Sequence, residues 1–194
     1  MLMMHCPDLS GTALNQDICK NIKMKKIVIL GNSGAGKTTL ALQLQQQLNL
    51  PLYHLDQLWW LPGWKEDTRE NFDRKLGEIL RKDSWIIDGE YTRTLAERLK
   101  FADTAILLDY PSILCLWRTL KRITLWYGKT RPGMTPGCPE RYDWAFLWYV
   151  WRFRRNYMDR INETLQNFHG EVIRLKSPAE AKRFIAHIDR HENQ

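Results

Sequence analysis

Long hydrophobic runs are absent from this sequence of 194 residues. The longest unbroken apolar stretch, Trp144–Trp151, spans eight residues, whereas a membrane-spanning helix needs about 20. The chain also lacks an opening basic segment followed by an apolar stretch and a small-residue cleavage site, the pattern of a secretory signal. These absences exclude a membrane-spanning protein. We therefore expect a cytoplasmic protein with no membrane partner.

Cysteine is scarce and scattered. The four cysteines are Cys6, Cys19, Cys115 and Cys138, and no two of them form a C-x-x-C pair. In a reducing compartment this spacing indicates free thiols. The sequence supports neither a disulfide framework nor a zinc site, and it contains no internal repeat.

Acidic residues are depleted in one quarter of the chain only. Between Pro111 and Arg160 there are ten Lys/Arg residues and three acidic ones, so this segment has a net charge of +7. The rest of the chain has equal numbers of basic and acidic residues. Clustering of this kind predicts an anionic ligand or partner near residues 111–160.

What is present is the pattern of one globular α/β domain, with 44% hydrophobic and 26% charged residues. Short apolar runs of strand length alternate with stretches of helical periodicity, which predicts a parallel sheet covered by helices on both faces. The expected strands are 27–30, 50–56, 84–89, 104–109 and 171–175, and the clearest helices are 37–48, 69–81, 143–168 and one that begins at Ser177-Pro178-Ala179-Glu180. Ser177 and Glu180 have the spacing of a capping box.

The domain is expected to span residues 24–194. Residues 1–23 have no sustained period and are expected to be a disordered extension. Residues 128–139 contain three glycines and three prolines, a composition typical of a loop between two helices. We expect a mobile lid over about 120–142.

The strongest motif is Gly31-Asn32-Ser33-Gly34-Ala35-Gly36-Lys37-Thr38, which satisfies G-x-x-x-x-G-K-[ST] in full between an expected strand and an expected helix. The glycines let backbone N–H groups point at phosphate oxygens, and the helix N-terminus adds a partial positive charge. The motif, extended to Thr39, predicts a binding site for the phosphates of ATP. Lys37 is expected to reach the β- and γ-phosphates, and the Thr38 hydroxyl to bind Mg²⁺.

A second Mg²⁺ partner is expected at the end of a neighbouring strand. Asp56, Asp88 and Asp109 each end an expected strand. Asp88 is the preferred metal partner if the sheet has the topology of nucleoside monophosphate kinases. Asp56 is better placed to orient an acceptor hydroxyl, but the sequence does not separate Asp56 from Asp88 as the residue that faces the acceptor.

Several further motifs occur in order: Tyr-His-Leu-Asp-Gln-Leu-Trp-Trp-x-Pro-Gly-Trp at 53–64, Trp-Ile-Ile-Asp-Gly at 85–89, and Arg-Pro-Gly-Met-Thr-Pro-Gly-Cys-Pro-Glu-Arg at 131–141, before the Trp-rich stretch at 144–151. From Met24 onward the chain resembles the bacterial DNA topology modulation protein family of adenylate kinase-related P-loop proteins. This resemblance implies a three-layer P-loop NTPase fold, with a five-stranded parallel sheet of nucleoside monophosphate kinase type, ATP and Mg²⁺ as cofactors, and an arginine-bearing lid.

The resemblance also implies roles for individual residues. Lys37, Asp56, Arg118, Arg122 and Arg131 are the expected catalytic residues, and Arg118 and Arg122 have the spacing of the arginine pair that leads into the adenylate kinase lid. Asp56, Asp88, Arg93, Arg141, Arg152 and Arg155 are the expected acceptor-binding residues. The chain departs from adenylate kinases after Gly89, where Glu90-Tyr91-Thr92-Arg93 replaces Phe-Pro-Arg, and this departure puts AMP in doubt as the acceptor.

Two groups of tryptophans need separate interpretations. Trp59, Trp60 and Trp64 either pack the acceptor arm onto the core or stack on a ring-shaped acceptor. Trp144, Trp148 and Trp151 have helical spacing and are expected to be buried.

Three functions remain open from these patterns. The first is a kinase that transfers the γ-phosphoryl group of ATP to an unidentified small molecule. The second is a nucleotide-dependent regulator of DNA topology, which the basic segment favours and the expected burial of its tryptophans disfavours. The third is an ATP-binding protein that only hydrolyses ATP slowly. A monomer and a homodimer both fit the sequence.

Overall fold

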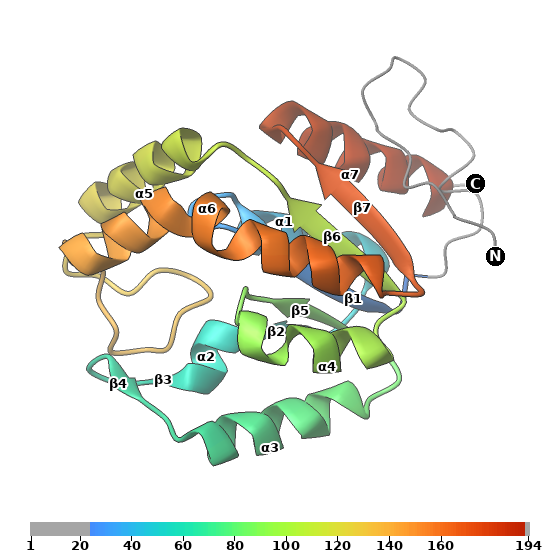
Figure 1. Ribbon diagram of the computed structural model, residues 1–194, viewed down its shortest axis with the longest axis horizontal. Helices are drawn as coiled ribbons and strands as arrows, with labels where there is room; N and C mark the ends of the chain where they lie inside the picture. The colour runs from blue at the N-terminus through green and yellow to red at the C-terminus, as the bar shows by residue number, and fades with distance from the viewer. Residues whose placement is uncertain (1–23, 193–194) are drawn as a thin grey trace.

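A computed structural model describes residues 24–192, so the expected extension at 1–23 lies outside the described residues. At its centre is a parallel sheet of five strands in the order β2-β5-β1-β6-β7 (Figure 1). These strands are β1 Lys26–Gly31, β2 Leu52–His54, β5 Trp85–Asp88, β6 Thr104–Leu108 and β7 Glu171–Leu175. The predicted five-stranded parallel sheet is confirmed.

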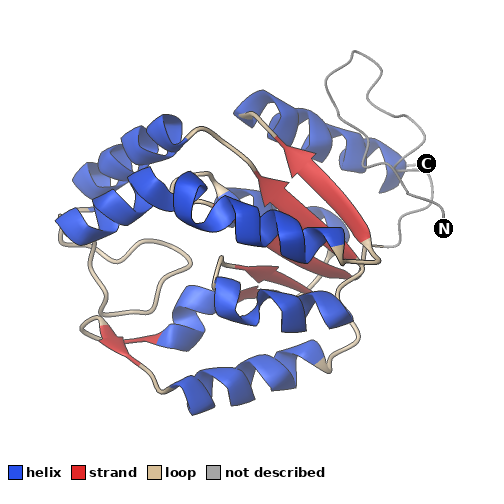
Figure 2. Ribbon diagram, in the orientation of Figure 1, coloured by secondary structure: helices blue, strands red, loops and turns tan. Residues whose placement is uncertain are grey.

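The central strands are continuous apolar runs because both faces of the sheet are covered. Every residue of β5 and β6 is buried, as are the last five of β1. The covering elements are α1 Lys37–Leu48, α2 Leu55–Trp59, α3 Arg69–Leu80, α4 Leu95–Phe101 after a 3-10 turn at Thr92–Thr94, α5 Ser112–Trp126, α6 Trp144–Gln166 and α7 Pro178–Glu192 (Figure 2).

Alternate residues of β1 point into two separate cores. Val28 and Leu30 pack with α3, α4 and the second half of α6, whereas Ile27 and Ile29 pack with α1, α7 and the start of α5. The molecule therefore has three layers, helices over sheet over helices, as expected.

The helix start predicted at Ser177 is confirmed. The Ser177 hydroxyl accepts a hydrogen bond from the Glu180 backbone N–H at 3.2 Å, and the Glu180 carboxylate accepts one from that hydroxyl at 3.2 Å. The first of these bonds caps the first turn of α7, and the Glu180 carboxylate reaches back to the Lys176 N–H at 2.8 Å and not to the Ser177 N–H of a full capping box.

One expected boundary is wrong. Asp56 does not end strand β2, because the strand stops at His54 and Asp56 lies in the first turn of α2. Within the expected lid, α5 continues to Trp126 and the loop between α5 and α6 spans 127–143, and this loop is called the lid below. After β2 and α2 the chain forms a small hairpin of β3 Trp60–Leu61 and β4 Lys65–Glu66. This hairpin is called the arm and lies beside the lid.

The expected burial of Trp144, Trp148 and Trp151 is wrong. These residues are 81%, 60% and 46% exposed. Leu147, Val150 and other apolar residues form the buried side of α6 instead. Helical spacing shows that three side chains share a face, but it does not show which face meets the core.

Candidate active site

The phosphate loop curls because its glycines adopt conformations that other residues avoid. Gly31, Gly34 and Gly36 have φ angles of 136°, 78° and 100°. A Cβ at Gly34 would lie 2.3 Å from the Cys115 carbonyl oxygen and 2.5 Å from the Thr119 hydroxyl. Loop 31–36 therefore packs directly on α5, and the loop ends at the N-terminus of α1, where backbone N–H groups and the helix dipole favour an anion.

Neighbouring elements hold this loop by hydrogen bonds. The Lys37 ammonium donates to the carbonyls of Gly31 and Asn32 at 2.9 and 3.0 Å. The Asn32 side chain donates to the Val150 carbonyl at 2.8 Å and so ties the loop to α6. The Gly31 N–H donates to the Glu90 carboxylate at 2.9 Å.

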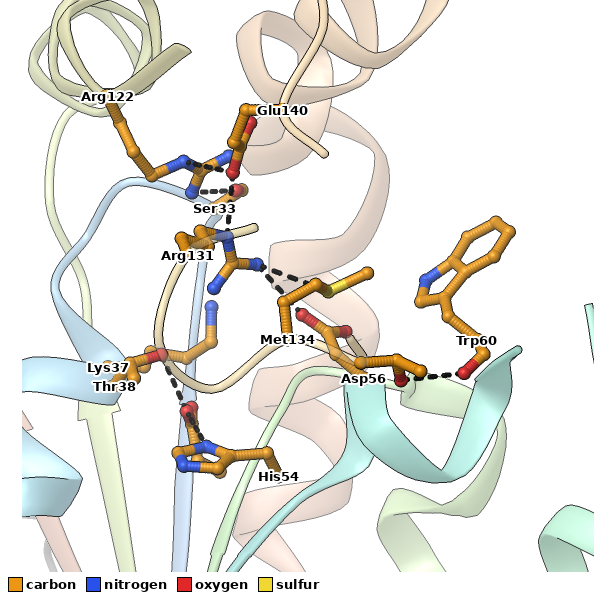
Figure 3. A network of polar contacts seen from close by, with 12 residues as sticks. Ser33, Lys37, Thr38, His54, Asp56, Trp60, Arg122, Arg131, Met134 and Glu140 are labelled. Atoms are coloured by element: carbon orange, nitrogen blue, oxygen red, sulfur yellow. Dashed lines mark hydrogen bonds and ion pairs between the residues drawn. The ribbon is translucent and has the colours of Figure 1, made fainter. Parts of the chain in front are cut away.

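Asp88 lies beside Thr38, as the strand order requires. Strand β5 pairs with β1 in parallel, and the Thr38 hydroxyl donates to Asp88 Oδ2 at 2.8 Å. His54 Nδ1 lies 3.0 Å from the same oxygen. Residues of three elements, α1, β2 and β5, thus meet at the Asp88 carboxylate, and Figure 3 shows Lys37, Thr38 and His54 on this side of the site.

The pKa values of the buried Asp88 and the partly buried Glu90 shift in opposite directions. Burial raises the pKa of Asp88, but the hydrogen bond with His54 and the charge of Lys37 outweigh it and hold this pKa below its usual range. For Glu90 burial dominates, so its pKa is raised despite the Gly31 N–H and Lys37. Of the two carboxylates, Asp88 is therefore the one that could hold a cation.

Asp56 faces the phosphate loop from the far side of the cavity. Its Oδ1 accepts a hydrogen bond from the Tyr91 hydroxyl at 3.1 Å, and its Oδ2 lies 3.1 Å from Arg131 Nη2. The Tyr91 ring stacks on Phe72, with the ring centroids 5.2 Å apart. This stacking holds the Tyr91 ring in place, and the Tyr91 hydroxyl in turn positions Asp56 Oδ1.

An arginine of α5 and an arginine of the lid meet at a buried carboxylate. The Glu140 side chain is 6% exposed, and its Oε1 lies 3.0 Å from Arg122 Nε and 2.8 Å from Arg131 Nε. Burial, and then the neighbouring charge of Arg131, lower the pKa of Arg122. Arg131 bridges Glu140 of the lid to Asp56 of the acceptor side (Figure 3).

Four hydrogen bonds join the lid to the arm, and a backbone carbonyl accepts each of them. The donors on the lid are the Thr135 hydroxyl, to the Trp60 carbonyl at 2.7 Å, and the Cys138 thiol, to the Leu61 carbonyl at 3.2 Å. The other two bonds run from the arm to the lid, from Gly63 N–H to Gly137 at 2.8 Å and from Trp64 Nε1 to Pro139 at 2.8 Å. These contacts join residues about 75 positions apart into one body.

The lid lies over Thr38 and His54. A Cβ at Gly133 would lie 2.9 Å from the Thr38 methyl carbon and 3.3 Å from His54 Cε1, so the lid backbone rests on both residues. Together the loop, lid, arm and Asp56 line a cavity of about 1330 Å³. This volume has room for a nucleotide and a second small molecule.

The other predicted arginines divide into two groups. Arg118, Arg93 and Arg141 line the cavity: Arg118 lies over the Tyr110 ring, Arg93 pairs with Asp73, and Arg141 lies over the Trp64 ring. Arg152 and Arg155 are not among its lining residues. Arg152 lies over the outward-facing Trp148 ring and Arg155 is exposed.

Asp109, the third candidate metal partner, has a different role. It is bound by Arg154 and by Arg174, the latter at 2.9 Å, and it lies outside the main cavity.

The tryptophans at 59–64 fit both predicted roles, packing on the core and lining the binding site. Trp59 packs edge-on against Phe72, and Trp59, Trp60 and Trp64 all line the cavity.

Sequence reasoning assigned no role to Glu90, Tyr91 or Glu140. Glu90 and Tyr91 follow the Asp88-Gly89 motif at the position where the chain departs from adenylate kinases, and this departure was the available clue. Glu140 is one of only three acids in the basic segment 111–160, and an isolated acid in such a segment is a candidate partner for its arginines.

Comparison with solved structures identifies the fold. A shikimate kinase from Acinetobacter baumannii in complex with shikimate has a TM-score of 0.55 and 18% identity, with 89% of this chain and 97% of that chain covered. The chain has the fold of the P-loop kinases. A deoxyadenosine kinase from M. mycoides with dCMP and dCDP bound gives a TM-score of 0.53 at 14% identity, covering 87% and 98%, and a shikimate kinase from Bacteroides thetaiotaomicron gives 0.51 at 16%, covering 88% and 99%.

No family model and no curated protein matches the chain. Neighbours at this level of identity establish the fold and not the reaction, so the function is argued from the site.

Proposed function

We propose that this protein is an ATP- and Mg²⁺-dependent kinase that phosphorylates a small molecule. The observation that carries this proposal is the convergence of Lys37, Thr38 and Asp88 at one end of a cavity whose opposite wall holds Asp56 and two arginines. A nucleotide-binding module without transfer chemistry has no need for a second polar wall facing its phosphates.

The residues at the metal position fit Mg²⁺. The Thr38 hydroxyl and the ionised Asp88 are hard oxygen donors on adjacent elements, and Mg²⁺ in such sites is completed by water and substrate phosphates. When bound, Mg²⁺ would neutralise charge on the β- and γ-phosphates.

The chain's own residues supply positioning and charge. Lys37 would exchange the carbonyls of Gly31 and Asn32 for phosphate oxygens, and Arg118, Arg122 and Arg131 would face the transferred group. Asp56 would accept the hydrogen bond of the acceptor hydroxyl and aim it at the γ-phosphate. The lid at 127–143 would keep water from the reacting atoms.

The acceptor class is an open part of this proposal. The related folds named above are a shikimate kinase and a deoxyadenosine kinase, so hydroxy acids, nucleosides, nucleoside monophosphates and sugars are the pools to test first. Trp60, Trp64 and Tyr91 line the acceptor side and favour a ring-shaped acceptor.

The test is phosphorus NMR of the full chain with Mg·ATP and each pool. We expect one pool to yield a new phosphoryl compound with the wild type and none with Lys37→Ala, whereas Lys100→Ala, at an exposed position on α4, should match the wild type. ATP that stays intact or is only hydrolysed in every pool would contradict the kinase. That result would favour the nucleotide-dependent regulator, whose mark is DNA affinity that falls steeply with salt.

A further inference from the structure

Helices α5 and α6 present large apolar side chains to solvent outside the cavity. Ile113, Trp117 and Leu125 of α5 are 62%, 58% and 67% exposed, and Trp144 and Trp148 of α6 are 81% and 60% exposed. Single exposed apolar residues are ordinary, but a contiguous group of this size marks an interaction site.

The exposed sides of the two helices form one surface, called here the α5–α6 face. The helices lie side by side (Figure 1). Ile113 at the start of α5 and Trp151 of α6 line the same shallow cavity, and near the other ends Thr124 Oγ1 lies 2.9 Å from the Tyr142 hydroxyl. The face is therefore joined at both ends.

Cations are interleaved with the indole rings of this face. The Lys121 ammonium lies 5.5 Å from the centre of the Trp117 ring, and the Arg152 guanidinium lies 5.2 Å from the centre of the Trp148 ring. Among the side chains described at residues 24–188, neither cation forms an ion pair with a carboxylate, and the same is true of the exposed Arg155. The partner must therefore be both apolar and anionic.

We propose that the α5–α6 face binds the surface of an anionic lipid bilayer. The indole rings and the aliphatic side chains would enter the headgroup region, and the interleaved lysine and arginine side chains would meet lipid phosphates. Tryptophan suits this boundary because its ring is apolar while its N–H can still donate, and basic residues beside an apolar helix face are attracted by anionic lipids.

Charge argues against a second copy of the chain on this face. In a two-fold dimer the same patch meets itself, so Lys121, Arg152 and Arg155 of each copy would oppose their equivalents, with the exposed Asp159 at the same helical spacing too little to offset three cations. The aliphatic residues argue against single-stranded nucleic acid, because bases stack on aromatic rings and Ile113 and Leu125 are among the most exposed side chains of the face.

This binding is independent of the proposed kinase activity, and it needs no spanning segment. No helix in the described part of the chain is long and apolar enough to cross a membrane. The expectation of no membrane partner rested on the absence of such a segment and did not consider a helix pair lying on the bilayer surface.

The test is co-sedimentation of the full chain with vesicles of phosphatidylcholine alone or mixed with phosphatidylglycerol. We expect binding to the mixed vesicles only, weakened by salt. The double variant Trp117→Ser/Trp148→Ser should bind at least about tenfold less, and Lys121→Glu should lower binding to the anionic vesicles. The controls Phe101→Ser and Lys100→Glu change an exposed aromatic residue and an exposed cation on α4 and should bind as the wild type does.

Thermal unfolding checks that each variant is folded. Failure of the wild type to bind anionic vesicles, or equal binding by the face variants and the controls, would overturn the proposal. So would a dimer, seen by light scattering, that the double variant abolishes, since the face would then bind a second copy. Binding of a single-stranded oligonucleotide in place of vesicles, lost in the same variants, would assign the face to nucleic acid.

Discussion

Close backbone packing on β6 and α5, together with side-chain hydrogen bonds, holds the phosphate loop at 31–36, whereas hydrogen bonds and ion pairs hold the lid on the other side of the cavity. The loop runs from a buried strand into a helix, and its glycines contact β6 and α5 too closely to admit a Cβ at Gly31 or Gly34. The lid at 127–143 contains no helix and no strand beyond a single β-bridge between Tyr127 and Glu140, and it is fixed by Glu140 and by four bonds to the arm.

This difference means that the phosphate loop is expected to keep its conformation, whereas the lid is expected to open and close. Opening the loop would break strand and core packing, which is the most stable kind of structure in a domain. Opening the lid needs only a few hydrogen bonds and two ion pairs to be exchanged for water. Arg131 contacts both Glu140 and Asp56. An acceptor bound at Asp56 and phosphates bound near Arg131 would therefore both change how readily the lid closes.

The largest expected effect is on chemistry and comes from the side of the phosphate loop. Asp88→Asn removes the charge beside Thr38 and should lower Mg²⁺-dependent phosphoryl transfer by about 10³-fold or more. Asp109→Asn is the matched control at another strand end. It should lower the stability, because it weakens a site bound by Arg154 and Arg174, while transfer stays within about threefold of the wild type. Equal transfer rates in the two variants would remove Asp88 from the active site.

Alanine at two glycines should distinguish the loop from the lid by stability. Gly31→Ala places a Cβ 2.7 Å from the Leu108 carbonyl oxygen at a φ of 136° and should lower the free energy of unfolding by about 3 kcal/mol or more. Gly128→Ala in the lid, with a φ of 72° and no atom within 4 Å, should cost only about 1 kcal/mol for its backbone conformation. Urea denaturation measures both, and similar losses would contradict the comparison.

Releasing the lid should change local motion more than global stability. Glu140→Gln leaves Arg122 and Arg131 close together without the carboxylate between them, so the amides of 127–143 should exchange with deuterium about tenfold faster or more. Exchange in loop 31–36 should change little. Glu78→Gln, which breaks an exposed ion pair with Arg74, should leave both segments unchanged. Unaltered exchange of the lid amides in Glu140→Gln would show that the four hydrogen bonds to the arm are sufficient to hold the lid.

The smallest expected effect is a pH dependence on the loop side. Burial raises the pKa of Glu90, so the folded state binds this proton more tightly than the unfolded state. Stability should therefore be lost as pH rises above the ordinary glutamate pKa of 4.5. In Glu90→Gln this loss should disappear, so the variant should gain stability relative to the wild type as the pH rises from 5 to 7.5. Urea unfolding at both values tests this, and a constant difference would contradict it.

The predictions from sequence succeeded where contacts are local. The segment 26–48 reads directly as strand, phosphate loop and helix because hydrophobic periodicity and glycine conformation act over a few residues. The strand order that brings Asp88 to Thr38 was expected only through the topology of the nucleoside monophosphate kinases, and the sheet confirms it.

They failed where the outcome depends on which surface meets which. The spacing of Trp144, Trp148 and Trp151 established a shared face but not its direction, and the structure turns that face outward. Arg152 and Arg155 do not line the cavity. The basic residues of 111–160 therefore do not all meet at one anion-binding site.

The sequence by itself determined the phosphate loop, the α/β class and the composition of the lid, because each depends on neighbouring residues and on backbone freedom. Only the tertiary structure decided that Arg131 bridges Glu140 and Asp56, that the lid is joined to the arm, and that the tryptophans of α6 face solvent. These features depend on contacts between residues tens of positions apart, and such contacts are set by how whole helices and strands pack rather than by any local pattern.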